Sequence, residues 1–102
     1  MAKDTDTILC FIYKTYLERI KSGISKTQSN EFDDNIFASD KNLSSWNAED
    51  IENCLIELHR QKLITRNIIG EFSLTTDALL QMENRFQNNL EKVLDILIKI
   101  FC

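Results

Sequence analysis

A short stretch of the sequence carries the best candidates for binding chemistry. Arg60, Lys62, Arg66 and Asn67 lie close together and form the one local concentration of basic side chains in the chain. Guanidinium and ammonium groups bind phosphate oxygens, so these four residues are candidate contacts to a nucleic-acid backbone or minor groove. The alternative interpretation is structural: Arg60 and Lys62 would balance the carbonyl end of a helix, and Arg66 would be a solvated strand residue.

The other reactive side chains form no recognisable catalytic or metal-binding motif. The single histidine, His59, has no nucleophile or carboxylate at a motif spacing, and the two glycines are too far apart for a phosphate-binding loop. Cys10, Cys54 and Cys102 include no Cys-x-x-Cys pair. We therefore expect no enzyme, no cofactor and no metal site, and we expect Cys10 and Cys54 to be reduced, small core residues.

Length, composition and charge indicate one globular domain. The chain has 102 residues, of which 43% are hydrophobic and 27% are charged, and its net charge is −4. A net negative charge disfavours non-specific binding to nucleic acid, although it leaves room for a local basic patch. The polar N-terminus does not resemble a signal peptide, and no long uncharged apolar run is present. We expect a cytoplasmic protein with no membrane partner.

The hydrophobic pattern predicts a mainly helical protein. Apolar side chains recur every four positions from Ile8 to Ile20, which predicts an amphipathic helix over residues 5–21 that ends before Gly23. The absence of proline and the scarcity of glycine leave few turn residues for a fold made of many strands.

The segment 24–46 is less regular. It predicts one short helix in which Phe32 and Ile36 contact each other four positions apart. Leu43 and Trp46 are isolated apolar residues in a polar stretch, and we expect them to insert into the core.

A helix and a hairpin follow. Asn47 or Ser45 can cap a helix that ends near Lys62. Residues 63–66 and 71–75 read as two short strands, and residues 67–70 are about the right length for the turn that joins them.

The last segment, residues 77–102, contains no helix breaker and would be roughly 40 Å long if wholly helical. The body of such a domain offers roughly 20–25 Å to pack against, so the helix would extend beyond it. The simplest cover for the exposed apolar side chains is a second copy of the chain in a homodimer; the alternative is a helix that breaks or folds back on its own domain. The predicted dimer interface consists of the apolar side of this helix: Leu79, Met82, Phe86, Leu90, Val93, Leu97, Ile100 and Phe101.

The order helix, helix, helix, hairpin, long helix is that of a winged helix-turn-helix domain. The junction carries apolar residues at Ile51, Cys54, Leu55 and Leu58, followed by Leu63-Ile64, a short wing and a closing Leu74-Thr75. This pattern resembles the small bacterial winged-helix proteins of the YjcQ-like type and, more distantly, the PadR and MarR repressor families.

The resemblance implies a winged-helix domain over residues 1–76, with residues 77–102 as a dimerisation helix of the same structural domain. It also implies a DNA-binding, transcription-regulator-like protein that acts as a dimer on double-stranded DNA. In that function Arg60, Lys62, Arg66 and Asn67 would contact the nucleic acid.

The charges of the third helix favour a different function. Its outward side would bring Glu49, Asp50, Glu52 and Glu57 toward the phosphates of a bound duplex, where like charges repel. The alternative is a winged-helix protein–protein interaction module that uses this acidic helix to bind a basic protein partner and does not bind DNA.

Overall fold

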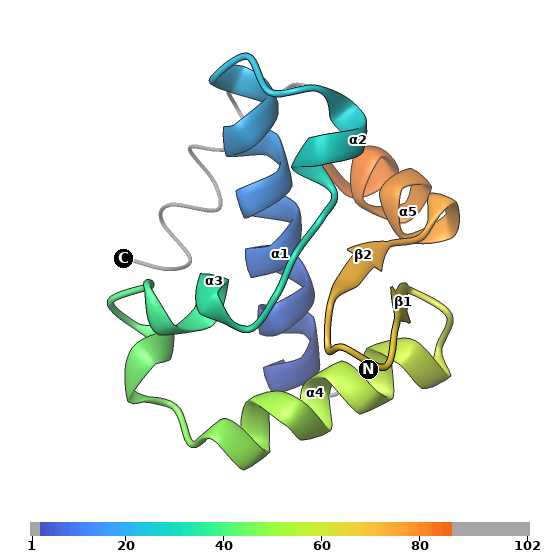
Figure 1. The fold of residues 1–102 in the computed structure, drawn as a ribbon. Coiled ribbons are helices and arrows are strands. Elements are labelled where there is room, and N and C mark those ends of the chain that lie inside the picture. The colour runs from blue at the N-terminus through green and yellow to red at the C-terminus, as the bar shows by residue number, and fades with distance from the viewer. Residues whose placement is uncertain (1–2, 87–102) are drawn as a thin grey trace.

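One long helix, α1 (Lys3–Lys21), forms the centre of the structure. The computed structural model describes residues 3–86, and the other elements of this range lie around α1 (Figure 1). Every side chain from residue 8 to residue 13 is buried, so this part of α1 is covered on all sides rather than along one stripe. The helix ends as predicted, with Gly23 in the left-handed conformation at φ 98°.

The segment after α1 differs from its prediction. It contains two single-turn helices, α2 (Lys26–Ser29) and α3 (Asn35–Ala38), and the 3₁₀ turn η1 (Leu43–Ser45). The expected helical contact of Phe32 is wrong, because Phe32 forms an isolated antiparallel bridge with Phe72 through two 2.9 Å main-chain hydrogen bonds. The two rings also stack at 5.6 Å. These tertiary contacts outweigh the local preference for a helix at Phe32.

Two isolated apolar residues of this segment pack as predicted. Leu43 is 1% exposed and is part of the core. Trp46 is half-buried and packs against the core from its edge.

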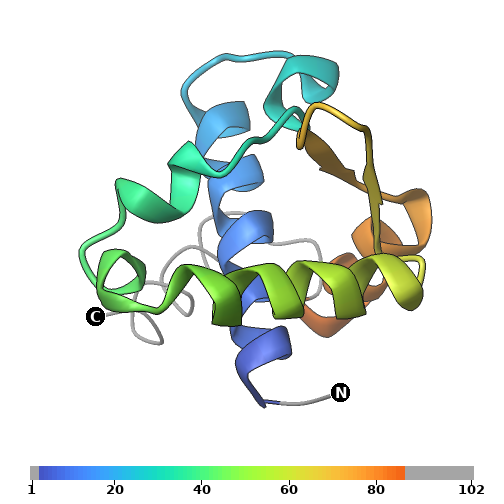
Figure 2. The ribbon, with the colours of Figure 1, turned by 60° about the horizontal axis from the view of Figure 1, so that its bottom comes forward.

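The next helix, α4 (Ala48–Arg60), crosses α1. The Asn47 side chain accepts a hydrogen bond from the main-chain N–H of Glu49 at 2.8 Å, which confirms the predicted cap. Figure 2 shows α4 across the front of α1, with α3 on one side and the hairpin on the other. Cys54 is 6% exposed on the buried face of α4, and Leu55 and Leu58 are fully buried.

The hairpin consists of β1 (Ile64–Arg66) and β2 (Phe72–Leu74), which pair in antiparallel register. Ile64 lies opposite Leu74, and Arg66 lies opposite Phe72. Because side chains alternate along a strand, these four residues share one side of the hairpin, and Thr65 and Ser73 lie on the other. The structure confirms the predicted class, a mainly helical chain with a small β-hairpin.

A side chain completes the outer edge of β2. The amide nitrogen of Asn30 donates to the main-chain oxygen of Leu74 at 2.9 Å, and its amide oxygen accepts from the main-chain N–H of Leu74 at 2.8 Å. Asn30 therefore satisfies both polar groups that a neighbouring strand would satisfy, next to the bridge of Phe32.

The last described helix, α5 (Thr76–Phe86), packs into the same core. Arg85 binds Asp6 of α1 with two hydrogen bonds, at 2.8 and 3.1 Å, and joins the last turn of α5 to the first turns of α1. The hydrogen bond to Asp6 raises the pKa of Arg85. Residues 87–102, which belong to the predicted long helix, lie outside the described part of the chain.

Helix α5 contains three residues of the predicted dimer interface, Leu79, Met82 and Phe86. Met82 is 2% and Phe86 is 8% exposed within a single chain, because α5 packs against α1 and the hairpin region. These two residues of the predicted interface are therefore part of the core of the single chain. Leu79 is half-buried and packs against the same core. The other predicted interface residues lie outside the described range: Leu90, Val93, Leu97, Ile100 and Phe101.

Within residues 3–86, no helix combines the length and the apolar character that crossing a membrane requires.

Asn30→Ala tests the side-chain closure of the β2 edge. The variant leaves the N–H and C=O groups of Leu74 without their partners, so we expect the free energy of unfolding to fall by about 1–3 kcal/mol in urea titrations. Asn35→Ala is the matched control, because the Asn35 side chain is exposed and makes no hydrogen bond within residues 3–86. Equal stability of the two variants would contradict the proposed role of Asn30.

Candidate functional site

The predicted basic cluster lies where α4 meets the hairpin, and its most central member is already paired. Strand alternation turns Arg66 toward α4, where its guanidinium binds the carboxylate of Glu52 with two hydrogen bonds, at 2.8 and 3.1 Å. The Arg66 side chain is 20% exposed, whereas that of Glu52 is 44% exposed. Two parallel bonds between these planar groups form the strongest kind of ion pair. The charge of Arg66 is therefore balanced inside the chain.

Arg60 is also paired, although it is more exposed. Its guanidinium lies 2.9 Å from the carboxylate of Glu57, one helical turn earlier. Gln61 donates to the other oxygen of the same carboxylate at 2.9 Å. An exposed pair of this kind adds little stability, but it places a negative charge beside Arg60.

Asn67 has a structural role in the turn. Its side-chain oxygen accepts hydrogen bonds from the main-chain N–H groups of Ile69 and Glu71, both at 3.0 Å. Its amide nitrogen donates to the Glu71 carboxylate at 3.2 Å. These bonds and the left-handed Gly70, at φ 99°, define the hairpin turn. The Asn67 side chain is thus used to fold the turn.

Lys62 is the fourth predicted contact. It adopts φ 62° at the end of α4, where its main-chain oxygen accepts a hydrogen bond from Thr75 at 2.8 Å. Its side chain is exposed and makes no ion pair with any residue from 3 to 86. Arg60 and Lys62 thus lie at the C-terminal end of α4, whereas Arg66 reaches back to Glu52 near its N-terminal end. Among the three cations of the predicted cluster, only Lys62 makes no ion pair within residues 3–86.

The turn of the hairpin exposes apolar side chains that the sequence interpretation did not single out. Ile68 is fully exposed and Ile69 is 83% exposed. On α4, Ile56 is 43% exposed. The sequence could have indicated the exposure of Ile68 and Ile69, because side chains in a tight turn between Asn67 and Gly70 cannot reach the core.

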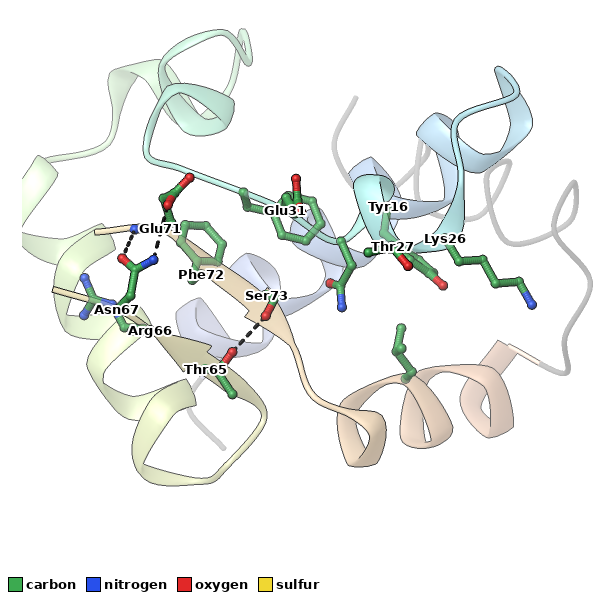
Figure 3. A pocket seen from close by; sticks show the side chains of 13 residues that line it. Tyr16, Lys26, Thr27, Glu31, Thr65, Arg66, Asn67, Glu71, Phe72 and Ser73 are labelled. Carbon is green, nitrogen blue, oxygen red and sulfur yellow. Dashed lines mark hydrogen bonds between the residues drawn. The ribbon is translucent and has the colours of Figure 1, made fainter. Parts of the chain in front are cut away.

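An open groove of about 760 Å³ lies beside the hairpin (Figure 3). The exposed side of the hairpin forms one wall, where the hydroxyl groups of Thr65 and Ser73 are hydrogen-bonded at 2.8 Å. Lys26 and Glu31 border the groove from α2 and the loop that follows it. The lining thus mixes both signs of charge, and no set of like polar groups converges on one point.

A second, smaller pocket of about 280 Å³ lies between α3, η1 and α4. We call it the α3–α4 pocket. Its apolar lining residues include Phe37, Leu43 and Trp46, and the acidic residues Asp34 and Glu52 are also part of the lining. Glu52 therefore links this pocket to Arg66 and the hairpin.

The described cysteines have no features of reactive thiols. Cys10 is 2% exposed, and burial raises its pKa to about 11. Burial also raises the pKa of Cys54. Both are core residues, as predicted. Among residues 3–86, no three histidine, cysteine or acidic side chains are grouped as metal ligands would be. His59 is exposed on α4.

The charges, the exposed isoleucines and the pocket lie around α4 and the hairpin, which we call the α4–hairpin face. It consists of the residues of α4 that reach solvent, including the partly exposed Glu52 and Glu57, together with Lys62, Arg66 and the turn residues 67–70. No family model, no curated protein and no solved structure matches the chain. What this face can bind is therefore inferred from its own residues.

The buried thiol and phenol groups predict how stability depends on pH. The unfolded chain releases the Cys10 proton near pH 9, whereas the folded chain holds it until about pH 11. Folding therefore binds protons in this window, and the free energy of unfolding should fall as pH rises, by at most about 1.4 kcal/mol per pH unit for one group. Tyr13, whose pKa burial raises to about 12, acts in the same direction.

Urea unfolding across this pH range measures the effect. Cys10→Ala is the control, because it removes one of the titrating groups and should make the decline shallower. A stability that is constant or rises with pH would contradict the buried, neutral state of these groups.

Proposed function

We propose that this chain is a winged-helix protein–protein interaction module that binds a basic partner protein through the α4–hairpin face. The order of elements supports the winged-helix part. Helix α1, the short helices α2 and α3, α4, the hairpin and α5 follow one another along the chain, and α4, which directly precedes the hairpin, takes the place that the sequence analysis gave to the third helix. The bridge between Phe32 and Phe72 also ties the segment between α1 and α4 to the hairpin.

The single observation that carries the choice of partner is the neutralisation of the basic cluster. Glu52 holds Arg66, and Glu57 holds Arg60, so a phosphate would have to compete with a carboxylate at each position. At the other end of α4, Glu49 and Asp50 are exposed and make no ion pair within residues 3–86. The α4–hairpin face is therefore acidic on balance and complements a basic surface.

The exposed apolar side chains of the hairpin turn also favour a protein partner. Ile68 and Ile69 project from a turn that is held by hydrogen bonds, so the backbone of the turn would lose little conformational freedom when they dock. Apolar side chains surrounded by polar ones are typical of protein–protein contacts.

Capture on the immobilised full-length chain tests the proposal. We expect at least one protein from an extract of the producing cells to be retained by the wild type and to fall about tenfold with the double variant Ile68→Ser, Ile69→Ser. Ile24→Ser is the matched control, because Ile24 is also an exposed isoleucine, at 40%, but lies between α1 and α2. Quantitative mass spectrometry of the retained proteins measures the difference.

A DNA-binding regulator is the second candidate function, since the resemblance implies it and the exposed Lys62 favours it. Fluorescence anisotropy with labelled genomic duplexes at low and moderate salt separates the two functions. We expect no binding by the wild type. The double variant Glu52→Gln, Glu57→Gln is the positive control of this assay. It leaves Arg60 and Arg66 without their carboxylate partners, so it should gain weak, salt-dependent binding to DNA. Salt-dependent binding by the wild type, without a captured protein that depends on Ile68 and Ile69, would overturn the proposal.

We also propose that the chain self-associates through residues 77–102. The apolar residues from Leu90 to Phe101 support this proposal, since leaving such side chains in water forfeits roughly 1.5–3 kcal/mol each. Met82 and Phe86 are not part of the proposed surface, because they are buried in the single chain.

Leu97→Asp tests self-association. Light scattering at micromolar concentration should give the mass of a dimer for the wild type and a lower mass for Leu97→Asp. Phe86→Asp is a useful contrast, because it places a charge in the core and should lower stability even where it leaves the mass unchanged. A monomeric wild type would contradict the dimer.

A further inference from the structure

The α3–α4 pocket has the size and the walls of a site for one apolar side chain. Its volume of about 280 Å³ is below the roughly 300–1,000 Å³ typical of sites for drug-sized molecules. The nearly buried Phe37 and Leu43 lie at its base, and the half-buried Trp46 and Ile51 add apolar surface. Tryptophan is among the residue types that are enriched where a few side chains supply most of the binding energy of a protein–protein contact.

The charges of the pocket are of one sign. Asp34 is exposed, and its carboxylate makes no hydrogen bond or ion pair within residues 3–86. Glu52 is the other charged residue of the lining, and no lysine or arginine contributes to the described walls. Because Arg66 balances the charge of Glu52, Asp34 is the carboxylate that remains to be matched by a ligand.

We propose that the α3–α4 pocket binds a segment of the partner protein in which an apolar side chain of the size of leucine or phenylalanine is adjacent to a lysine or arginine. The apolar side chain would enter between Phe37 and Trp46, and the cation would lie near Asp34. This inference rests on the proposed function and deepens it, since it names the anchor through which a basic partner is recognised.

The chain carries a built-in probe for this site, because Trp46 is its single tryptophan. Titration of the full-length wild type with short synthetic peptides should therefore change the fluorescence of Trp46 only when the pocket is filled. Three peptides, capped at both ends, separate the contributions: glycine-flanked Lys-Leu-Lys, Glu-Leu-Glu and Lys-Gly-Lys. We expect the first to bind roughly tenfold more tightly than the second, and the third to leave the fluorescence unchanged.

Two variants place the binding in the pocket. Ala48→Leu, at an exposed alanine of the lining, should abolish the response by filling the pocket, and leucine keeps a good helix propensity there. Asp34→Asn should weaken binding of the Lys-Leu-Lys peptide by roughly threefold, as expected for an exposed charge pair. Asp77→Asn is the matched control, since Asp77 is exposed in the first turn of α5 and should bind like the wild type.

Three outcomes would overturn the inference. The first is equal binding of the Lys-Leu-Lys and Glu-Leu-Glu peptides, and the second is unchanged binding by Ala48→Leu or Asp34→Asn. The third is Trp46 fluorescence that changes with the concentration of the protein but not with the concentration of any peptide. That result would indicate that the pocket is filled by a second copy of the chain. In each case the retention of a partner that depends on Ile68 and Ile69 still reports separately on the proposed function.

Discussion

The constraint on which the structure depends is the burial of the middle of α1, where every side chain from residue 8 to residue 13 is shielded from solvent. A helix segment with apolar side chains on every face cannot lie at the surface, so the remaining elements must surround it. They do so with short pieces: α4 on one side, α5 on another, and the small helices with the hairpin around the rest. Arg19 helps to hold the loop after α2 in place, because it donates to the main-chain oxygen of Glu31 at 2.7 Å and lies over the Phe32 ring at 4.9 Å. The positions of α4 and the hairpin, and hence of the proposed binding face, follow from covering α1.

The ion pair between Glu52 and Arg66 connects the architecture to the proposed function. It joins α4 to β1, so it stabilises the angle between the helix and the hairpin. The same pair removes the positive charge on which a phosphate site at this position would depend. One interaction thus makes the face well ordered and less suited to nucleic acid. The exposed Ile68 and Ile69 add apolar surface to this ordered face.

The elements with regular spacing were predictable, and those that depend on distant contacts were not. The boundaries of α1 and α4 follow from apolar periodicity and from the Asn47 cap, which are local signals. The pairing of Phe32 with Phe72 depends on residues forty positions apart, so nothing near Phe32 indicates it. The pairing of Arg66 was not predictable either, because its partner Glu52 is fourteen residues away on the neighbouring helix.

The amide of Asn30 has a consequence for association through β-sheet edges. A strand edge with free N–H and C=O groups is a template on which another chain can add a strand, which leads to domain swapping or fibrils. At β2 this template is interrupted: Phe32 occupies one pair of groups, and a side chain occupies the next. A side chain cannot propagate the ladder to a further strand, so growth of the sheet stops there. A two-stranded hairpin is thereby kept from acting as a seed for aggregation on this side.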